Sequence, residues 1–82
     1  ELENAENEYL YALNSYNNAI ENLKLAEKIE RKNQIKFLEG LISGLELRQA
    51  QIQLYSIQNE LLQSMLEVIN KKTALEIMLT QN

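Results

Sequence analysis

The sequence predicts an all-α fold, a single long antiparallel α-helical hairpin of the coiled-coil type that occupies residues 1–82. Three observations predict it. The chain has no proline, and its only two glycines, Gly40 and Gly44, stand close together near the middle. Apolar residues recur at alternating spacings of three and four, which is the heptad pattern of two packed helices. The chain is also rich in Leu, Glu, Lys, Ala, Gln and Ile, which favour helix.

The first predicted helix runs from about residue 2 to about residue 38. Its seam alternates a large apolar residue with an alanine at Leu2, Ala5, Tyr9, Ala12, Tyr16, Ala19, Leu23 and Ala26. This alternation lets two helices approach closely, because each large side chain fills the space beside an alanine. Glu30 and Asn33 take the next two seam positions, so the seam weakens there and resumes at Phe37.

Capping residues predict a turn at about 39–43. Gly40 suits the left-handed backbone position that ends a helix, where a Cβ is unfavourable. Ser43 precedes Glu46 by three residues, which is the spacing of a capping box at the start of a helix. The second helix is therefore expected to begin at about residue 44.

The second predicted helix, about 44–80, carries two apolar stripes. The first consists of Leu47, Ala50, Leu54, Ile57, Leu61, Ser64, Val68, Lys71, Leu75 and Met78. The other consists of Leu45, Ile52, Tyr55, Leu62, Leu66, Ile69 and Thr73. The two stripes lie roughly 150° apart on a 3.5-residue period. Because a two-helix hairpin covers only one stripe, the other needs a further neighbour, either more of the same polypeptide or another subunit.

The sequence offers no catalytic or metal-binding pattern. It contains no His, Cys, Asp or Trp, which excludes Ser-His-Asp and Cys-His nucleophiles, HExxH metal sites and zinc sites. Glutamates at helical spacing are interpreted as a solvated face, and the tyrosines at 9, 16 and 55 as packing residues. We therefore predict a protein that is not an enzyme and takes no cofactor or metal.

Charge and hydropathy also exclude two classes of partner for this segment. The longest basic stretch runs from Lys28 to Lys36, but Glu27 precedes it and Glu30 interrupts it, so no continuous positive stripe for nucleic acid is present. No apolar run approaches the ~20 residues that a membrane-spanning helix needs. The chain begins without Met and already in helical register, so we expect it to be part of a longer polypeptide.

Two features allow both a structural and a functional interpretation. Asn59, Ser64, Lys71 and Thr73 interrupt the apolar stripes of the second helix. They either fix the register of packing or line a face that borders water, as a channel wall would.

The turn itself poses the second question. Local capping predicts that Leu41 packs back on Ile35 and that Ile42 contacts Leu47. The functional alternative is that Gly40, Leu41, Ile42 and Ser43 form an apolar knob that binds another helical tip.

Three ordered segments carry a family resemblance. They are KFLEGLISGLELRQAQIQLY at 36–55, NKKTAL at 70–75, and the upstream spacing Tyr16, Ala19, Leu23, Ala26. Together they resemble the TolC family of outer-membrane efflux proteins over most of residues 9–79. Glu39 stands where that family often has Val, and Ile42 and Gln49 stand where some members carry charged latch residues.

The resemblance implies a homotrimeric duct, with a β-barrel in the outer membrane and an α-helical tube in the periplasm. This chain would be one hairpin of the tube wall. Gly40, Leu41, Ile42 and Ser43 would bind the periplasmic adaptor protein, and an inner-membrane pump would drive multidrug efflux or type I secretion through the bore.

Two other interpretations stay open. The chain could be an oligomerising coiled-coil scaffold module of the cytoplasm without a transport role, which the heptads and the second stripe fit equally well. It could also be the hairpin of a periplasmic adaptor, but those hairpins carry an Arg-Leu tip motif that this sequence lacks.

Overall fold

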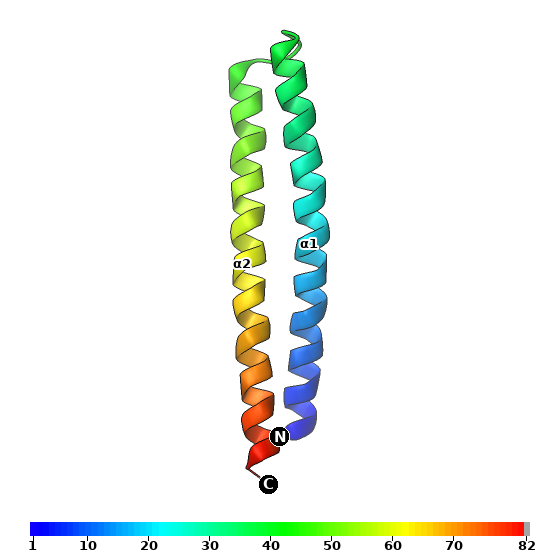
Figure 1. The fold of residues 1–82 in the computed structure, drawn as a ribbon, viewed down its shortest axis with the longest axis vertical. Coiled ribbons are helices and arrows are strands. Elements are labelled where there is room, and N and C mark those ends of the chain that lie inside the picture. Colours follow the sequence, from blue (N-terminus) through cyan, green and yellow to red (C-terminus); the bar gives the residue numbers. More distant parts are fainter. Residues whose placement is uncertain (82) are drawn as a thin grey trace.

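The structure, a computed structural model, describes residues 1–81 and consists of two long helices. Helix α1 spans Leu2–Leu38 and helix α2 spans Gly44–Thr80. They lie side by side and antiparallel, so that the start of α1 and the end of α2 share one end of the rod (Figure 1). The rod measures 64 × 14 × 13 Å. The predicted helical hairpin is confirmed, with both helix bounds as expected.

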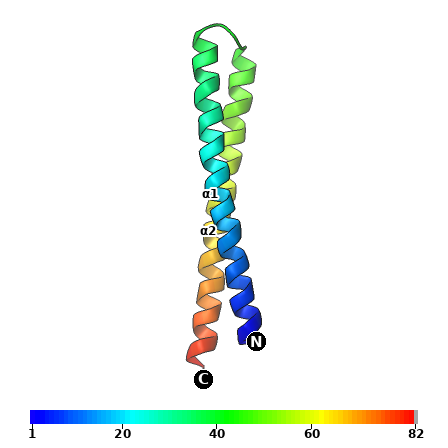
Figure 2. The same ribbon diagram turned by 90° about the vertical axis from the view of Figure 1, so that its right-hand side faces the viewer.

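The two helices are not parallel but cross each other at a small angle. Viewed from the side, α1 passes in front of α2 near the middle of the rod (Figure 2). Such crossing is expected where a seam repeats every 3.5 residues, because a straight helix has 3.6 residues per turn and drifts away from the seam.

The predicted seam is the interface between the helices. On α1 every seam position from Leu2 to Asn33 is buried or half-buried, and the most buried are Ala5, Ala12 and Ala26, with exposed fractions of 8%, 2% and 6%. On α2 every residue of the first stripe, from Leu47 to Met78, is half-buried. The alanines are the most enclosed residues because the larger α2 side chains close over them.

The second stripe of α2 is uncovered, as predicted. We call Leu45, Ile52, Tyr55, Leu62, Leu66, Ile69 and Thr73 the outer stripe. Its six large apolar side chains are between 54% and 66% exposed, and Thr73 is exposed as well. A single hairpin therefore leaves an apolar row, interrupted at Arg48 and Asn59, in contact with water along most of α2.

Backbone hydrogen bonds close the turn. Gly40 has a φ of 77°, the left-handed conformation expected of it. The Leu41 amide donates to the Lys36 carbonyl at 2.8 Å and the Gly40 amide to the Phe37 carbonyl at 3.0 Å, which together form a Schellman motif. At the start of α2, the Glu46 amide donates to Ser43 Oγ at 3.2 Å, so the predicted N-cap is present.

Phe37 departs from the expected seam. It is 42% exposed instead of buried. Helix α1 ends one residue later and α2 begins only at Gly44, so Phe37 lies over the first turn of α2, with Cε1 3.7 Å from where a Gly44 Cβ would stand. One neighbour cannot enclose a phenylalanine at the end of a two-helix rod, and the seam therefore effectively stops at Asn33.

Candidate interaction surfaces

The turn brings the four predicted partner-binding residues together at one end of the rod. Leu41 is 67% exposed and Ile42 is half-buried. Gly40 has the left-handed conformation that ends α1, and Ser43 is the N-cap of α2. The Schellman hydrogen bonds form without burying Leu41, because its expected partner Ile35 is itself 53% exposed. Leu41 therefore presents most of its side chain to the surroundings of the tip.

Two further apolar side chains lie at this end, although the sequence did not assign either of them to the tip. Leu38 in the last turn of α1 is 83% exposed, and Leu45 in the first turn of α2 is 66% exposed. We call Leu38, Leu41 and Leu45 the tip surface. The signal in the sequence was a leucine in each terminal turn at a position outside the heptad seam, where a soluble helix end normally carries a polar residue.

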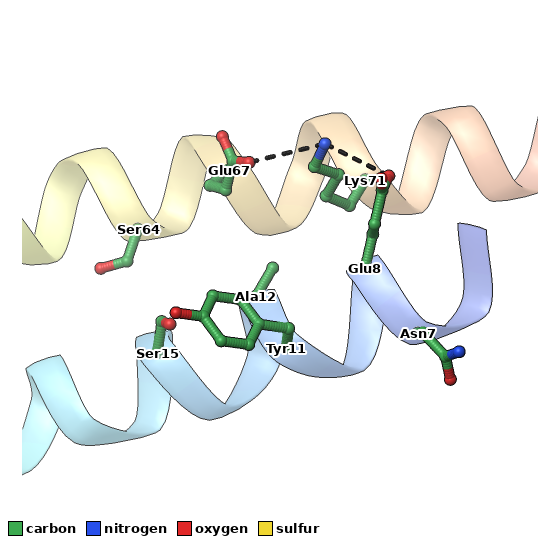
Figure 3. Close-up of a pocket in the computed structure, with 8 residues that line it drawn as sticks. All are labelled: Asn7, Glu8, Tyr11, Ala12, Ser15, Ser64, Glu67 and Lys71. Carbon is green, nitrogen blue, oxygen red and sulfur yellow. Dashed lines mark hydrogen bonds and ion pairs between the residues drawn. The ribbon is translucent and has the colours of Figure 1, made fainter. Parts of the chain in front are cut away.

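A polar groove lies between the helices in the half of the rod away from the tip (Figure 3). Its walls are formed by Asn7, Glu8, Tyr11, Ala12, Ser15, Ser64, Glu67 and Lys71. Two of the four polar residues that interrupt the stripes, Ser64 and Lys71, belong to this groove. The other two, Asn59 and Thr73, are exposed on α2. The structure thus separates residues that the sequence analysis grouped together.

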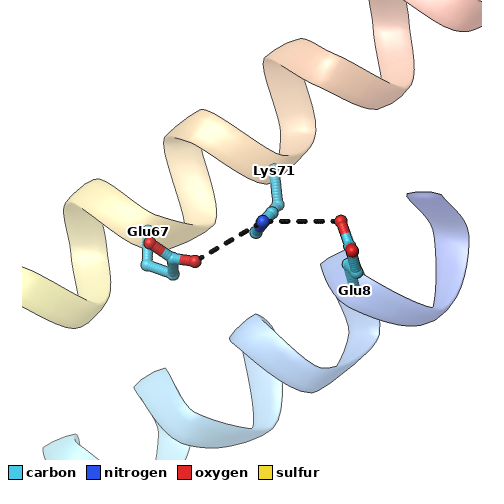
Figure 4. Close-up of polar contacts among 3 residues, drawn as sticks. All are labelled: Glu8, Glu67 and Lys71. Atoms are coloured by element: carbon cyan, nitrogen blue, oxygen red, sulfur yellow. Dashed lines mark hydrogen bonds and ion pairs between the residues drawn. The ribbon is translucent and has the colours of Figure 1, made fainter. Parts of the chain in front are cut away.

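Lys71 is the polar centre of the groove. Its Nζ lies 3.4 Å from Glu8 Oε2 on α1 and 3.7 Å from Glu67 Oε1 one turn earlier on α2 (Figure 4). The Lys71 side chain is 34% exposed and its partners are more exposed still, so water screens both ion pairs. Ser64 uses its hydroxyl locally, donating to the Glu60 carbonyl at 2.8 Å and within reach of the Leu61 carbonyl at 3.1 Å.

A second groove, on the tip side of the first, has more apolar residues in its walls. Asn22, Leu25, Ala26, Ile29, Ala50, Gln53, Ile57 and Glu60 line it. Nearby in the seam, Glu30 has one buried carboxylate oxygen, Oε2, without a hydrogen-bond partner among residues 1–81. A buried oxygen that has lost its hydrogen bonds to water destabilises the fold. Packing of the two helices is therefore expected to be weak at Glu30, as the sequence predicted.

The described residues offer neither a metal site nor a membrane-spanning helix. Within residues 1–81 no three acidic, histidine or cysteine side chains come together in a way that could hold a metal ion. Over the same range, neither helix has a stretch apolar enough to cross a bilayer. The exposed surfaces that remain as candidates are the tip surface, the outer stripe and the polar groove.

Comparisons of the chain with protein-family models, with curated proteins and with solved structures found no match.

Proposed function

We propose that this hairpin is a wall segment of a trimeric, TolC-like outer-membrane duct that serves tripartite efflux or type I secretion. In this proposal the segment lies in the periplasm, and substrate passes through the assembled bore while an inner-membrane pump supplies the energy. The hairpin contributes packing surfaces and a docking tip, and no catalytic group.

The observation that carries the proposal is that α2 has two apolar faces. One stripe faces α1, and the outer stripe, from Leu45 to Thr73, is exposed along nearly the whole helix. A helix in the wall of a tube has a neighbour on each side and needs two apolar faces for them. The ordered segments at 36–55 and 70–75 add the family resemblance to this requirement.

The tip supports the docking part of the proposal. Leu41 is 67% exposed next to a rigidly hydrogen-bonded Gly40, and Leu38 and Leu45 enlarge the apolar area at the same end. Exposed leucines on a fixed backbone are suited to contact a second helical tip, since little conformational entropy is lost when they bind. The periplasmic adaptor is the partner that the resemblance implies for this end.

The exposed outer stripe favours one alternative function as strongly, an oligomerising coiled-coil scaffold without a transport role. Both functions bury the same stripe against another helix. They differ in where the polypeptide resides and how large it is, so cell fractionation separates them.

An antibody raised against residues 1–82 tests the proposal in the source cells. We expect it to detect a polypeptide several times larger than 9.5 kDa in the outer-membrane fraction, migrating as a trimer unless the sample is boiled. A small band confined to the soluble cytoplasmic fraction would overturn the duct and leave the scaffold in its place.

A further inference from the structure

The outer stripe of α2 requires an occupant, and two properties of the chain restrict which helix that can be. The stripe presents six large apolar side chains, each at least 54% exposed, over the length from Leu45 to Ile69. An occupant must offer an apolar row of similar length. It must also accommodate Arg48 and Glu76, the charged residues on the same face of α2 near its two ends.

The outward face of α1 in a second copy does not meet the first condition. The exposed apolar residues of α1 are broken into separate groups, because Leu10 and Tyr11 are divided from Leu25 and Ile29 by polar residues. Asn14, Asn17, Asn18, Glu21, Lys24, Lys28 and Arg31 are all exposed. Covering the outer stripe with this face would remove water from several charges and amides without offering them partners. A side-by-side array of copies in which α2 meets α1 is therefore unfavourable.

The α2 helix of a second copy meets both conditions when it runs antiparallel. We propose that the 82-residue chain forms a two-fold dimer in which the outer stripes of two α2 helices pack antiparallel, giving a four-helix bundle. Centring the two-fold axis between Asn59 and Leu62 places Ile52 level with Ile69 of the second copy. The same alignment places Tyr55 level with Leu66 of the second copy, so large apolar residues meet on both sides of the axis. At the axis itself Leu62 lies level with Asn59, and toward the ends Leu45 lies level with Glu76.

Charge selects the antiparallel orientation. In the antiparallel dimer, Arg48 of each copy lies close to the level of Glu76 of the other. In a parallel dimer, Arg48 would face Arg48 and Glu76 would face Glu76, which is unfavourable at both ends.

The charges of α1 also favour the antiparallel orientation, although they lie farther from the dimer interface. Residues 1–8 contain four glutamates and no basic residue, whereas residues 24–36 contain five basic residues and two glutamates. Antiparallel association brings the acidic end of one rod toward the basic half of the other.

The dimer does not depend on the proposed function. It uses the stripe that a duct neighbour would otherwise cover, so the two are alternative occupants of one surface.

Sedimentation equilibrium of the purified 82-residue chain, across a range of micromolar concentrations, is the first test. We expect a concentration-dependent transition to twice the 9.5 kDa chain mass. Leu62→Glu should abolish dimers, and circular dichroism should show that the variant is still helical. The matched control is Leu25→Glu on α1, because Leu25 is 59% exposed and Leu62 54%, but Leu25 lies outside the stripe. A helical monomer at all concentrations, or a dimer that Leu62→Glu leaves intact, would overturn the proposal.

A spin label at Gln49 determines the orientation and uses no residue of the stripe. In the antiparallel dimer Gln49 lies level with Lys72 of the second copy, so the two labels stand about 35 Å apart along the axis at ~1.5 Å per residue. In a parallel dimer they would be separated only by the helix packing distance of about 10 Å and the label arms. As a second check, Arg48→Glu should weaken the dimer at least several-fold, and adding Glu76→Arg should restore it. A short distance between labels, or no rescue by the charge exchange, would contradict the antiparallel arrangement.

Discussion

Lys71 of α2 reaches across the helix interface to Glu8 of α1, with Nζ 3.4 Å from Oε2 (Figure 4). The contact joins residues 63 positions apart in the sequence, in the half of the rod away from the turn. It shows that the register set by the turn is kept to the far end of the hairpin. It also explains how a lysine is tolerated at a seam position, because its ammonium group leaves the seam at the groove and pairs there.

The Glu8–Lys71 pair should contribute little to the free energy of unfolding. A double-mutant cycle with Glu8→Gln and Lys71→Met should give a coupling below ~1 kcal/mol, since both partners are partly solvated. The coupling should shrink further in 1 M NaCl, where the Debye length is about 3 Å. Urea unfolding at one fixed protein concentration measures it. A coupling of several kcal/mol that salt does not change would mean that the pair is far more enclosed than its exposure indicates.

Ala12 should not tolerate a larger side chain. It is 2% exposed in the seam, so Ala12→Leu should force the helices apart and lower the free energy of unfolding by about 1–3 kcal/mol. The control is Ala74→Leu, a similar change at an exposed position of α2, which should stay within about 0.5 kcal/mol of the starting protein. Thermal unfolding followed by circular dichroism compares the two. Equal effects would contradict the close approach of the helices at Ala12.

The two glycines should respond to alanine with opposite signs. Gly40 has a φ of 77°, where a Cβ costs about 1–2 kcal/mol, so Gly40→Ala should destabilise the hairpin although nothing lies within 4 Å of the new methyl group. Gly44 is helical, and its Cβ would make an ordinary 3.7 Å contact with Phe37. Gly44→Ala should therefore stabilise the protein by about 0.5–1 kcal/mol. Paired urea titrations test both signs, and Gly40→Ala without a loss of stability would rule out the left-handed cap.

Leu41→Asp tests the proposed docking of the tip in cells. Because Leu41 is 67% exposed, the substitution should leave folding and duct abundance unchanged while placing a charge where an apolar contact is needed. We expect weaker adaptor binding and greater drug sensitivity. Glu39→Asp, a conservative change in the same exposed turn, serves as the control and should retain resistance. Unaltered resistance in the Leu41→Asp strain, with the protein present at normal levels, would remove the docking role.

Local chemistry in the sequence was sufficient to predict the secondary structure. The absence of proline, the two neighbouring glycines and the heptad spacing predicted helices at 2–38 and 44–80, and the structure has them at Leu2–Leu38 and Gly44–Thr80. Gly40 and Ser43 were assigned to caps for reasons confined to a few neighbouring residues, namely backbone sterics and unsatisfied amides. These forces depend only on residues near in sequence, so a pattern can reveal them.

The candidate surfaces were only partly predictable, because exposure depends on both helices at once. The sequence predicted an uncovered stripe from Leu45 to Thr73, but it placed Phe37 in the seam, and it offered Ile35 as the cover for Leu41. The structure leaves the side chains of Phe37, Ile35 and Leu41 exposed, since the rod ends there and offers no third neighbour.

The sequence by itself determined the two helices, their caps and the seam, because helical periodicity and capping act over one or two turns. The tertiary structure decided the pairing of Lys71 with Glu8, the common groove of Ser64 and Lys71, and the unpartnered oxygen of Glu30. A heptad pattern repeats every seven residues and so allows several alignments of one helix on the other. Only the closed turn selects one of them, and with it the side chains that meet across the interface.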